Sequence, residues 1–430
     1  MGGFVGSPRS AVTSDPQILF IDHTGELAGG QLCLADIVVR LRNRCAVFLF
    51  ERGPFGEFLE KQGVTVRLPK GGVSALSVRK KSGWLAYLAS GPNLLSLVRC
   101  LAREAKGFDL LYANTAKALM VTAVTALLLR KPFLFHLHDI ISPEHFNRLN
   151  SWLLVTGANL ANGIVANSEA SAAAYRREGG KNRNLIVIPN GFEIERFAVE
   201  ASAPVRAIRT AIGAENRPLV GLFGRIAAWK GQKVLIQALS SLPEVSGVLV
   251  GEALFTDEDQ QYKGELIRLL EKLGLSNRVQ LVGFQLDILP YLKAVDLVVH
   301  CSVSPEPFGR VIVEAQLAGK PVIATRGGGP SEIIQDRLTG ILVEPNDPKH
   351  LAKAIRELLE NRKWAGELAA RGRQAAIARF GLENVLNSWT EFIYRTALGS
   401  RTSRSPNRES LSSAMKTPPE AKTAEKKKCA

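Results

Sequence analysis

Two consecutive series of short apolar segments, each segment followed by an amphipathic one, constrain the fold of this chain most strongly. The apolar segments are rich in β-branched and aromatic residues, whereas the segments between them have helical periodicity. Strands that alternate with helices in this way are typical of parallel, doubly wound sheets. The expected strands lie at 17–22, 45–50, 65–68, 110–112, 133–137, 163–166 and 185–188, then at 219–223, 247–250, 279–282, 297–300, 321–325 and 340–343.

The two series predict an α/β protein with two Rossmann-like domains whose parallel sheets face a central cleft. We expect a flexible N-terminus at 1–15, a first domain at 16–200 and a second domain at 201–383. The stretch 201–218, rich in Ala, Arg and Pro, is interpreted as the linker. A helix near 384–398 is expected to return to the first domain, and 399–430 is expected to be a disordered basic tail.

The chain carries a net charge of +15 over 430 residues. Residues 401–430 contribute eight basic and three acidic side chains to it. This excess favours anionic partners such as nucleotides, phospholipid surfaces or nucleic acid. Because no nucleic-acid-binding module or basic run interleaved with aromatics is present, nucleic acid is not expected as a partner.

Cysteine usage and hydropathy indicate the compartment. The five cysteines are scattered and form no CxxC pair, which argues against disulfides or a zinc site and fits a reducing cytoplasm. The N-terminus has no basic start followed by an apolar run, so a secretory signal is not expected. The longest apolar stretch, 118–129, is shorter than a membrane span and is interpreted as a buried helix.

Two glutamates eight positions apart, Glu306 and Glu314, provide the strongest functional signal. Glu306 lies in a loop before a predicted helix, and Glu314 lies on an early turn of that helix, so both can face one cleft. The free N–H groups of Gly309, Arg310 and Val311 begin the helix and could bind a phosphate. The alternative reading is an acidic loop followed by a solvent-facing helix glutamate.

The segment 304–315, together with the glycine-rich segment 327–332, resembles the E-x7-E region of retaining GT-B glycosyltransferases of family 4. The resemblance implies a nucleotide-sugar donor, UDP- or GDP-linked, in the second domain and an acceptor on the side of the first. It implies that Glu306 holds hydroxyls of the donor sugar and that Glu314 hydrogen-bonds the ribose. Phe308 belongs to the same donor-binding segment.

Two basic residues after the first strand of the second domain are candidates for binding the donor pyrophosphate. Arg225 and Lys230 follow Gly224, and without a metal such side chains must neutralise the diphosphate. In the family this pair binds the pyrophosphate. Alternatively, the two residues are exposed charges on a loop.

The first domain offers a glycine pair and a histidine. Gly29 and Gly30 follow the first strand, where glycines allow a ligand to approach the backbone. His138 ends a buried strand, and the resemblance places it near the reacting carbon of the donor sugar. His136 is expected to be structural. Gln31 departs from the family, which often has Ala followed by Glu here.

Two further segments complete the site predictions. Gly283 and Phe284 resemble the loop that brackets the nucleobase. Asp257-Glu258-Asp259 has the D-x-D pattern that binds a metal in other glycosyltransferases, but no strand precedes it. We interpret it as a solvated helix start, stabilised by the helix dipole. No metal and no cofactor are therefore expected.

These observations predict a cytoplasmic, retaining, metal-independent hexosyltransferase in glycan or cell-envelope polysaccharide synthesis, acting on a glycan, lipid-linked glycan or other acceptor. The alternatives are an epimerase or phosphorylase on the same fold, or a non-catalytic nucleotide-sugar-binding protein. Basic residues 79–81 precede aromatic and aliphatic residues at 84–88. This segment forms either a patch that contacts anionic lipid at the inner membrane face or a basic turn before a partly buried helix.

Overall fold

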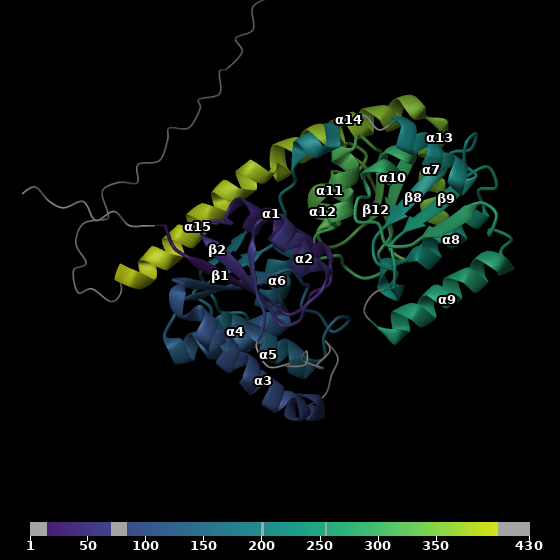
Figure 1. The fold of residues 1–430 in the computed structure, drawn as a ribbon. Coiled ribbons are helices and arrows are strands. Elements are labelled where there is room, and N and C mark those ends of the chain that lie inside the picture. The colour runs from purple at the N-terminus through teal and green to yellow at the C-terminus, as the bar shows by residue number, and fades with distance from the viewer. Residues whose placement is uncertain (1–14, 70–83, 199–201, 254–255, 403–430) are drawn as a thin grey trace, which may run out of the picture.

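The computed structural model describes residues 15–69, 84–198, 202–253 and 256–402. It contains two parallel sheets (Figure 1), so the predicted fold class is confirmed. The first sheet has the order β3-β2-β1-β4-β5-β6-β7, and the second has the order β10-β9-β8-β11-β12-β13. The first sheet consists of β1 (Ile18–Asp22), β2 (Cys45–Leu49), β3 (Thr65–Arg67), β4 (Leu110–Ala113), β5 (Phe133–Leu137), β6 (Gly163–Ala166) and β7 (Leu185–Val187). The second consists of β8 (Leu219–Phe223), β9 (Ser246–Val250), β10 (Val279–Val282), β11 (Leu297–His300), β12 (Val322–Thr325) and β13 (Ile341–Val343).

Helices cover both faces of the N-terminal sheet, as the apolar runs of its strands require. One hydrophobic core lies beneath α3 (Trp84–Glu104), α4 (Ala116–Leu129), α5 (Arg148–Asn159) and α6 (Glu169–Arg177). The other lies beneath α1 (Gly29–Arg40), α2 (Pro54–Lys61) and the last helix, α15 (Leu382–Thr402). The site described below forms at the carboxyl ends of these strands, where ligands bind in doubly wound sheets.

The C-terminal sheet is covered in the same way. The core on one face includes side chains of α8 (Gln232–Ser240), α9 (Asp257–Lys272) and α13 (Pro348–Glu360). The other face packs against α7 (Ser202–Ile212), α10 (Leu289–Ala294), α11 (Arg310–Leu317) and α12 (Pro330–Ile333). Helix α14 (Arg362–Phe380) contributes to both cores.

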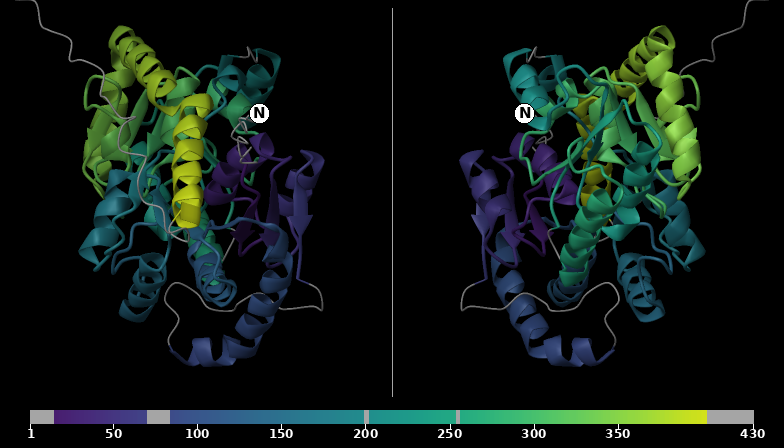
Figure 2. Two further views of the ribbon diagram at one scale, coloured as in Figure 1. Left: turned by 90° about the vertical axis from the view of Figure 1, so that its left-hand side faces the viewer. Right: turned by 90° about the vertical axis from the view of Figure 1, so that its right-hand side faces the viewer.

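Helix α15 leaves the C-terminal domain and runs along the N-terminal one (Figure 2, yellow). Its Trp389 is 1% exposed and stacks on Phe20 of β1, with ring centroids 5.8 Å apart. Trp389 Nε1 also donates a hydrogen bond to the Tyr112 hydroxyl at 3.0 Å. The last helix therefore completes the core of the first domain, and it extends beyond residue 398 to Thr402.

Two interpretations of the sequence were wrong. The segment interpreted as a linker forms helix α7, because Val205, Ile208 and Ile212 recur on one face and Ile212 is buried against the second domain. The helix at 118–129 is not fully buried, because Leu127 and Leu128 are 59% and 68% exposed.

Residues 1–14, the segment 70–83 and the tail beyond residue 402 lie outside the described part of the chain. The predictions for the flexible N-terminus, for the basic residues 79–81 and for the basic tail therefore stay untested. None of the described helices combines the length and the apolar run needed to cross a bilayer.

Candidate active site

Glu306 is held by three donors in the loop between β11 and α11. Its Oε2 lies 2.5 Å from Lys230 Nζ, 3.2 Å from His300 Nε2 and 3.2 Å from Ser302 Oγ. His300 ends β11 and Lys230 ends a short 3-10 helix (Ala228–Lys230) that follows β8. Neighbouring strands of the second sheet thus bring together residues that lie far apart in the sequence.

This surrounding keeps Glu306 ionised although its side chain is buried. Burial alone would raise the pKa of the Glu306 carboxyl, but the charge of Lys230 and the hydrogen bond from His300 outweigh burial and hold the pKa well below its usual range. The Lys230 ammonium also lies 4.2 Å from the centre of the Trp229 ring. The result is a fixed carboxylate, one of whose oxygens, Oε2, takes all three of these contacts.

The glycines of the 327–332 segment position the Glu306 loop. Gly329 N donates to the Glu306 carbonyl at 2.8 Å, and Glu306 forms a parallel β-bridge with Gly328. Gly328 has a φ of +64°, and a Cβ added there would lie 2.2 Å from the Glu306 carbonyl oxygen. Both the left-handed conformation and this close approach therefore require glycine.

Helix α11 carries the second glutamate of the predicted pair. Arg310 Nη2 lies 3.7 Å from Glu314 Oε1, and Arg310 Nη1 lies 3.3 Å from Asp36 Oδ2 on α1 of the other domain. Burial raises the pKa of Asp36 to about 6, although Arg310 acts to lower it. Burial also raises the pKa of Glu314. Arg310 therefore links the two domains beside the glutamate that was expected to contact the ribose.

Gly29 and Gly30 lie between Arg310 and His138. A Cβ at Gly29 would be 3.7 Å from Arg310 Cδ, and a Cβ at Gly30 would be 3.7 Å from His138 Cδ2. Both are ordinary contact distances, so neither glycine is needed to avoid a clash. Because the pair begins α1, it brings the backbone and the helix N-terminus to this point without covering it with side chains.

His138 is oriented by a chain of polar residues. Its Nε2 lies 2.9 Å from Asn114 Oδ1, and Asn114 Nδ2 donates to Asp22 Oδ2 at 2.6 Å. Because the Asn114 amide donates to Asp22, its oxygen faces His138, and His138 Nε2 is then the protonated ring nitrogen. Burial lowers the pKa of His138 to about 4, although Asp139 and Asp22 act to raise it. His138 is therefore neutral near pH 7, with a lone pair on Nδ1.

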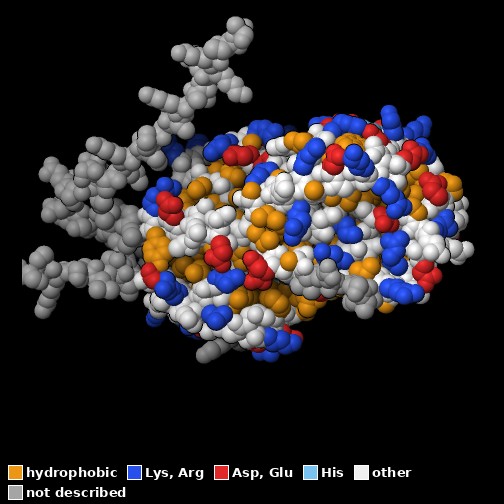
Figure 3. Space-filling view, turned by 90° about the horizontal axis from the view of Figure 1, so that it is seen from above, with side chains coloured by type: hydrophobic (Ala, Val, Ile, Leu, Met, Phe, Trp, Pro, Cys, Tyr) orange, Lys and Arg blue, Asp and Glu red, His pale blue; other side chains and the backbone are white. Residues whose placement is uncertain are grey.

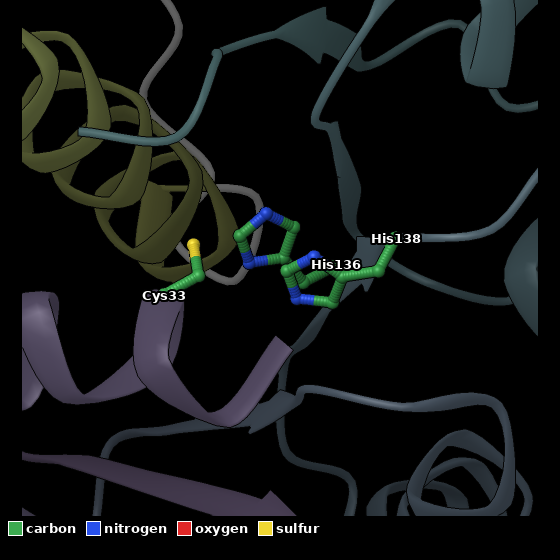
Figure 4. Close-up of side chains that lie close together, drawn as sticks. All are labelled: Cys33, His136 and His138. Atoms are coloured by element: carbon green, nitrogen blue, oxygen red, sulfur yellow. The ribbon is translucent and has the colours of Figure 1, made fainter. Parts of the chain in front are cut away.

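Cys33, His136 and His138 lie close together (Figure 4). The two histidine rings are stacked with centroids 3.8 Å apart and an interplanar angle of 29°. Since the nitrogen lone pairs lie in the ring planes, stacked rings do not direct them at one ion. Burial also raises the pKa of the Cys33 thiol to about 12, and its Sγ lies 3.1 Å from Asn190 Oδ1. We assign no metal to this cluster.

The remaining predicted residues directly follow strands β8 and β10 of the second sheet. Gly224 and Arg225 follow β8. Burial raises the pKa of Asp259, although the positive charge of Arg225 acts to lower it. Asp259 belongs to the D-x-D segment, which starts α9 with Thr256 as the N-cap, so its interpretation as a helix start is confirmed. Phe284, after β10, is 47% exposed.

A second contact between the domains lies next to the Glu306 loop. The Glu332 carboxylate on α12 accepts hydrogen bonds from the backbone N–H groups of Glu169 and Ala170, at 2.9 and 2.7 Å. These N–H groups begin α6 of the first domain, where a negative charge is favourable. A pocket of about 300 Å³ beside this contact is lined by Phe308 and Arg379 among others.

Sequence reasoning missed Asp22, Asn114 and His300, which hold the predicted residues in place. Asp22 and His300 each end a buried strand, and Asn114 directly follows one. A polar residue at the carboxyl end of an apolar strand was thus the available signal, since these strand ends meet at the ligand-binding edge.

Comparisons with known proteins identify the family of the chain. The family model for Glycosyltransferase Family 4 matches residues 28–196, and the model for Glycosyl transferases group 1 matches residues 205–379. The chain is 37% identical to HepE from Anabaena, whose structure was solved in complex with UDP-glucose. The match has a TM-score of 0.79 and covers 88% of this chain and 99% of that one. The chain therefore belongs to family 4 (group 1) of the GT-B glycosyltransferases.

Two curated relatives are similar over part of the chain. A lipopolysaccharide core biosynthesis glycosyltransferase, LpsE, of Rhizobium meliloti is 34% identical over 41% of this chain and 50% of the relative. A D-inositol 3-phosphate glycosyltransferase of Xylanimonas cellulosilytica is 32% identical over 56% of this chain and 60% of the relative. The chain thus spans between half and three-fifths of the lengths of these two relatives.

Proposed function

We propose that this glycosyltransferase transfers a hexose from a UDP-linked donor, without a metal and with retention of the anomeric configuration. The observation that carries the proposal is the ionised Glu306 fixed by Lys230, in the loop before Arg310, which lies beside Gly29 of the first domain. HepE binds UDP-glucose and shares more than a third of its residues with this chain, which supports a UDP-linked donor.

The charges suit a donor diphosphate. Lys230, Arg225 and Arg310 are cationic, and α11 directs its first N–H groups out of its N-terminus. Together they can neutralise the negative charge that grows on the diphosphate as the glycosidic bond breaks. This arrangement supports metal independence, because side chains and a helix dipole supply the charge that a divalent cation supplies elsewhere.

The reaction we propose is a substitution on one face of the sugar. The bond between the anomeric carbon and the diphosphate oxygen breaks, and the acceptor oxygen bonds to the same face of that carbon. The acceptor proton passes to a phosphate oxygen, so UDP leaves with it. Glu306 binds donor-sugar hydroxyls and does not attack, because Lys230 and His300 stabilise its charge. His138 accepts a hydroxyl hydrogen bond at Nδ1 near the reacting carbon.

The acceptor we propose is a glycan or a lipid-linked glycan of the cell envelope, used in the cytoplasm. The similarity to a lipopolysaccharide core transferase supports this class of acceptor. Gln31 takes part in the buried network around Asp22, at 3.1 Å from its Oδ2. Its side chain is therefore turned into the domain, which leaves acceptor recognition to other residues.

The test is product stereochemistry. Purified protein, a glycan acceptor and UDP-α-glucose are incubated with EDTA, and the product is analysed by ¹H NMR as it forms. The proposal expects an α-linked product. A β-linked product would contradict retention, and a reaction that needs added Mg²⁺ or Mn²⁺ would contradict metal independence. Epimerised donor without acceptor, or a requirement for inorganic phosphate, would indicate an epimerase or a phosphorylase.

A further inference from the structure

Arg310 lies at the boundary between the two domains, between two carboxylates. It is the first residue of α11, and α11 lies beside α1 of the first domain (Figure 1). Arg310 Nη1 donates a hydrogen bond to Asp36 Oδ2 on α1 at 3.3 Å. Arg310 Nη2 lies 3.7 Å from Glu314 Oε1, one turn further along α11, which is too far for a hydrogen bond. The guanidinium is therefore hydrogen-bonded to the other domain and is held to its own helix neighbour by charge alone.

The carboxylate of Glu314 lacks hydrogen-bond donors. Its side chain is 15% exposed, and among residues 15–69, 84–198, 202–253 and 256–402 none donates a hydrogen bond to it. A mostly buried carboxylate without donors is unfavourable. Burial accordingly raises the pKa of Glu314, although the charge of Arg310 acts to lower it. Glu314 is thus an acceptor that a ligand with hydroxyl groups can satisfy, at the position where the ribose is expected.

Two other arginines beside this group already have acidic partners. Arg40, one turn after Asp36 on α1, lies 2.9 Å from Glu193. Arg196, whose charge acts on Glu314, lies 2.6 Å from Asp287. The carboxylates on α1 and α11 therefore share the guanidinium that lies between them.

The shared guanidinium differs from the charged groups at the surface. On the face seen from above, basic and acidic side chains are interspersed and open to solvent (Figure 3). Pairs of such exposed charges are weak, because water and salt screen them. The Arg310 side chain is only 16% exposed, and its Cζ lies 4.6 Å from the centre of the Phe192 ring. The ring supports the guanidinium from one side, and this contact does not depend on which carboxylate the guanidinium meets.

We propose that Asp36 is a positioning residue for the donor nucleotide. By holding the Arg310 guanidinium, it keeps Glu314 free to accept hydrogen bonds from the two ribose hydroxyls. Without the charge of Asp36, the guanidinium would turn to Glu314, the carboxylate that remains, and occupy it. Because Asp36 belongs to the first domain, the ribose site of the second domain is complete only where the domains meet. The inference rests on the proposed UDP-linked donor, since it needs a ribose at Glu314.

The test compares UDP with 2′,3′-dideoxy-UDP, which has the same base and diphosphate but lacks both ribose hydroxyls. Isothermal titration calorimetry gives the Kd of each nucleotide, and the ratio of the two values isolates the ribose contact. The wild type should bind UDP about tenfold more tightly or better, because the analogue cannot donate to a carboxylate. Asp36→Asn should weaken UDP binding until the ratio is about one, while dideoxy-UDP binds as before.

A second substitution separates this mechanism from the simple loss of a contact between the domains. In Asp36→Asn/Arg310→Met the cation that would occupy Glu314 is gone, so the ratio should return to about tenfold. Both nucleotides should bind this variant more weakly, because a cation near the diphosphate is lost. The control is Glu193→Gln, which removes a neighbouring carboxylate that pairs with Arg40, and it should keep the wild-type ratio.

An unchanged ratio in Asp36→Asn would overturn the inference, as would an equal loss in the control or a double variant that does not recover. A wild type that binds UDP with a ratio near one would overturn it and leave the proposed donor standing, whereas a wild type that binds neither nucleotide would contradict both. Asp36→Asn keeps the side-chain size and leaves Arg310 paired with Glu314, so its Tm should stay close to that of the wild type. If this variant does not fold, Arg310→Met alone decides, because it should keep the ratio and a loss there would overturn the inference.

Discussion

The two domains present groups of different electrostatic character to the candidate active site. The C-terminal domain presents a buried ion pair, Lys230 with Glu306, and the pKa of that glutamate is held low. The N-terminal domain presents glycine backbone and His138, which burial keeps neutral because its pKa falls to about 4. One side therefore presents an ion pair, and the other presents glycine backbone and a neutral histidine backed by the carboxylate of Asp22.

This difference separates two tasks that a glycosyl transfer requires. A nucleotide diphosphate is anionic before and after reaction, so the charged domain suits binding and the leaving group. The transferred sugar is neutral, so hydrogen-bonding groups without net charge suit the other side. Asp36 is an exception on the N-terminal side, because it pairs with Arg310 across the boundary at 3.3 Å.

The largest effect is expected for Glu306→Ala. Removing one partner of a buried ion pair leaves Lys230 uncompensated, which lowers the free energy of unfolding by about 3 kcal/mol. Turnover should fall about 100-fold or more, because donor-sugar hydroxyls lose their acceptor. Initial rates and urea unfolding measure both effects. The control is Glu357→Ala, which breaks an exposed ion pair with Arg337 and should change neither by much. Normal turnover in Glu306→Ala would remove the glutamate from the site.

Substitution of His138 should give the next largest effect, which should appear in the turnover rate and in the pH dependence of that rate. His138→Ala is expected to lower kcat by about 100-fold while KM changes little. Because the neutral form is active and its pKa is about 4, the rate should stay level as pH falls through 6.5. Folding should behave differently: the unfolded histidine binds protons near pH 6.5, so its contribution to stability is lost as pH falls towards 4. A His138-dependent inflection of the rate near pH 6.5 would contradict the neutral form.

Substituting a glycine in each domain should have a different kind of effect. In the second domain the substitution should lower stability, and in the first it should weaken donor binding. Gly328→Ala places a Cβ against the Glu306 carbonyl at a positive φ, and should lower the free energy of unfolding by about 1–3 kcal/mol. Gly30→Ala adds a Cβ at an ordinary contact distance of 3.7 Å from His138 Cδ2, so its Tm should stay close to that of the wild type while KM for the donor rises. Calorimetry and steady-state kinetics separate the two. An unchanged KM in Gly30→Ala would show that this backbone does not face the ligand.

The smallest effect is expected at the contact between the domains. Glu332→Gln removes a carboxylate charge from the N-terminus of α6, which is worth about 0.5–1 kcal/mol. The domains should then separate more readily, which small-angle scattering would record as a larger radius of gyration. The control is Glu367→Ser, which changes an exposed glutamate. An unchanged radius would mean that Glu332 does not help to keep the domains together.

The fold followed from local patterns in the sequence, whereas the roles of the site residues came from the resemblance to family 4 and stay predictions. Alternating strands predicted both sheets, and the spacing of Glu306 and Glu314 placed them at one edge. Asp36 lay beyond such reasoning, because its partner Arg310 is on another domain and no local pattern links them. Helix α7 was missed because its composition resembles a linker, although Val205, Ile208 and Ile212 carry a helical period.

Binding of UDP in the presence of EDTA tests the central claim most directly. Thermal shifts with UDP, GDP, ADP and TDP compare the nucleotides under one condition, and Glu357→Ala serves again as the control. We predict that UDP raises the Tm of the wild type, that EDTA does not alter this shift, and that Lys230→Ala reduces it sharply. No shift with any nucleotide, or a shift that EDTA abolishes, would contradict a donor site built from Lys230 and the α11 N-terminus without a metal.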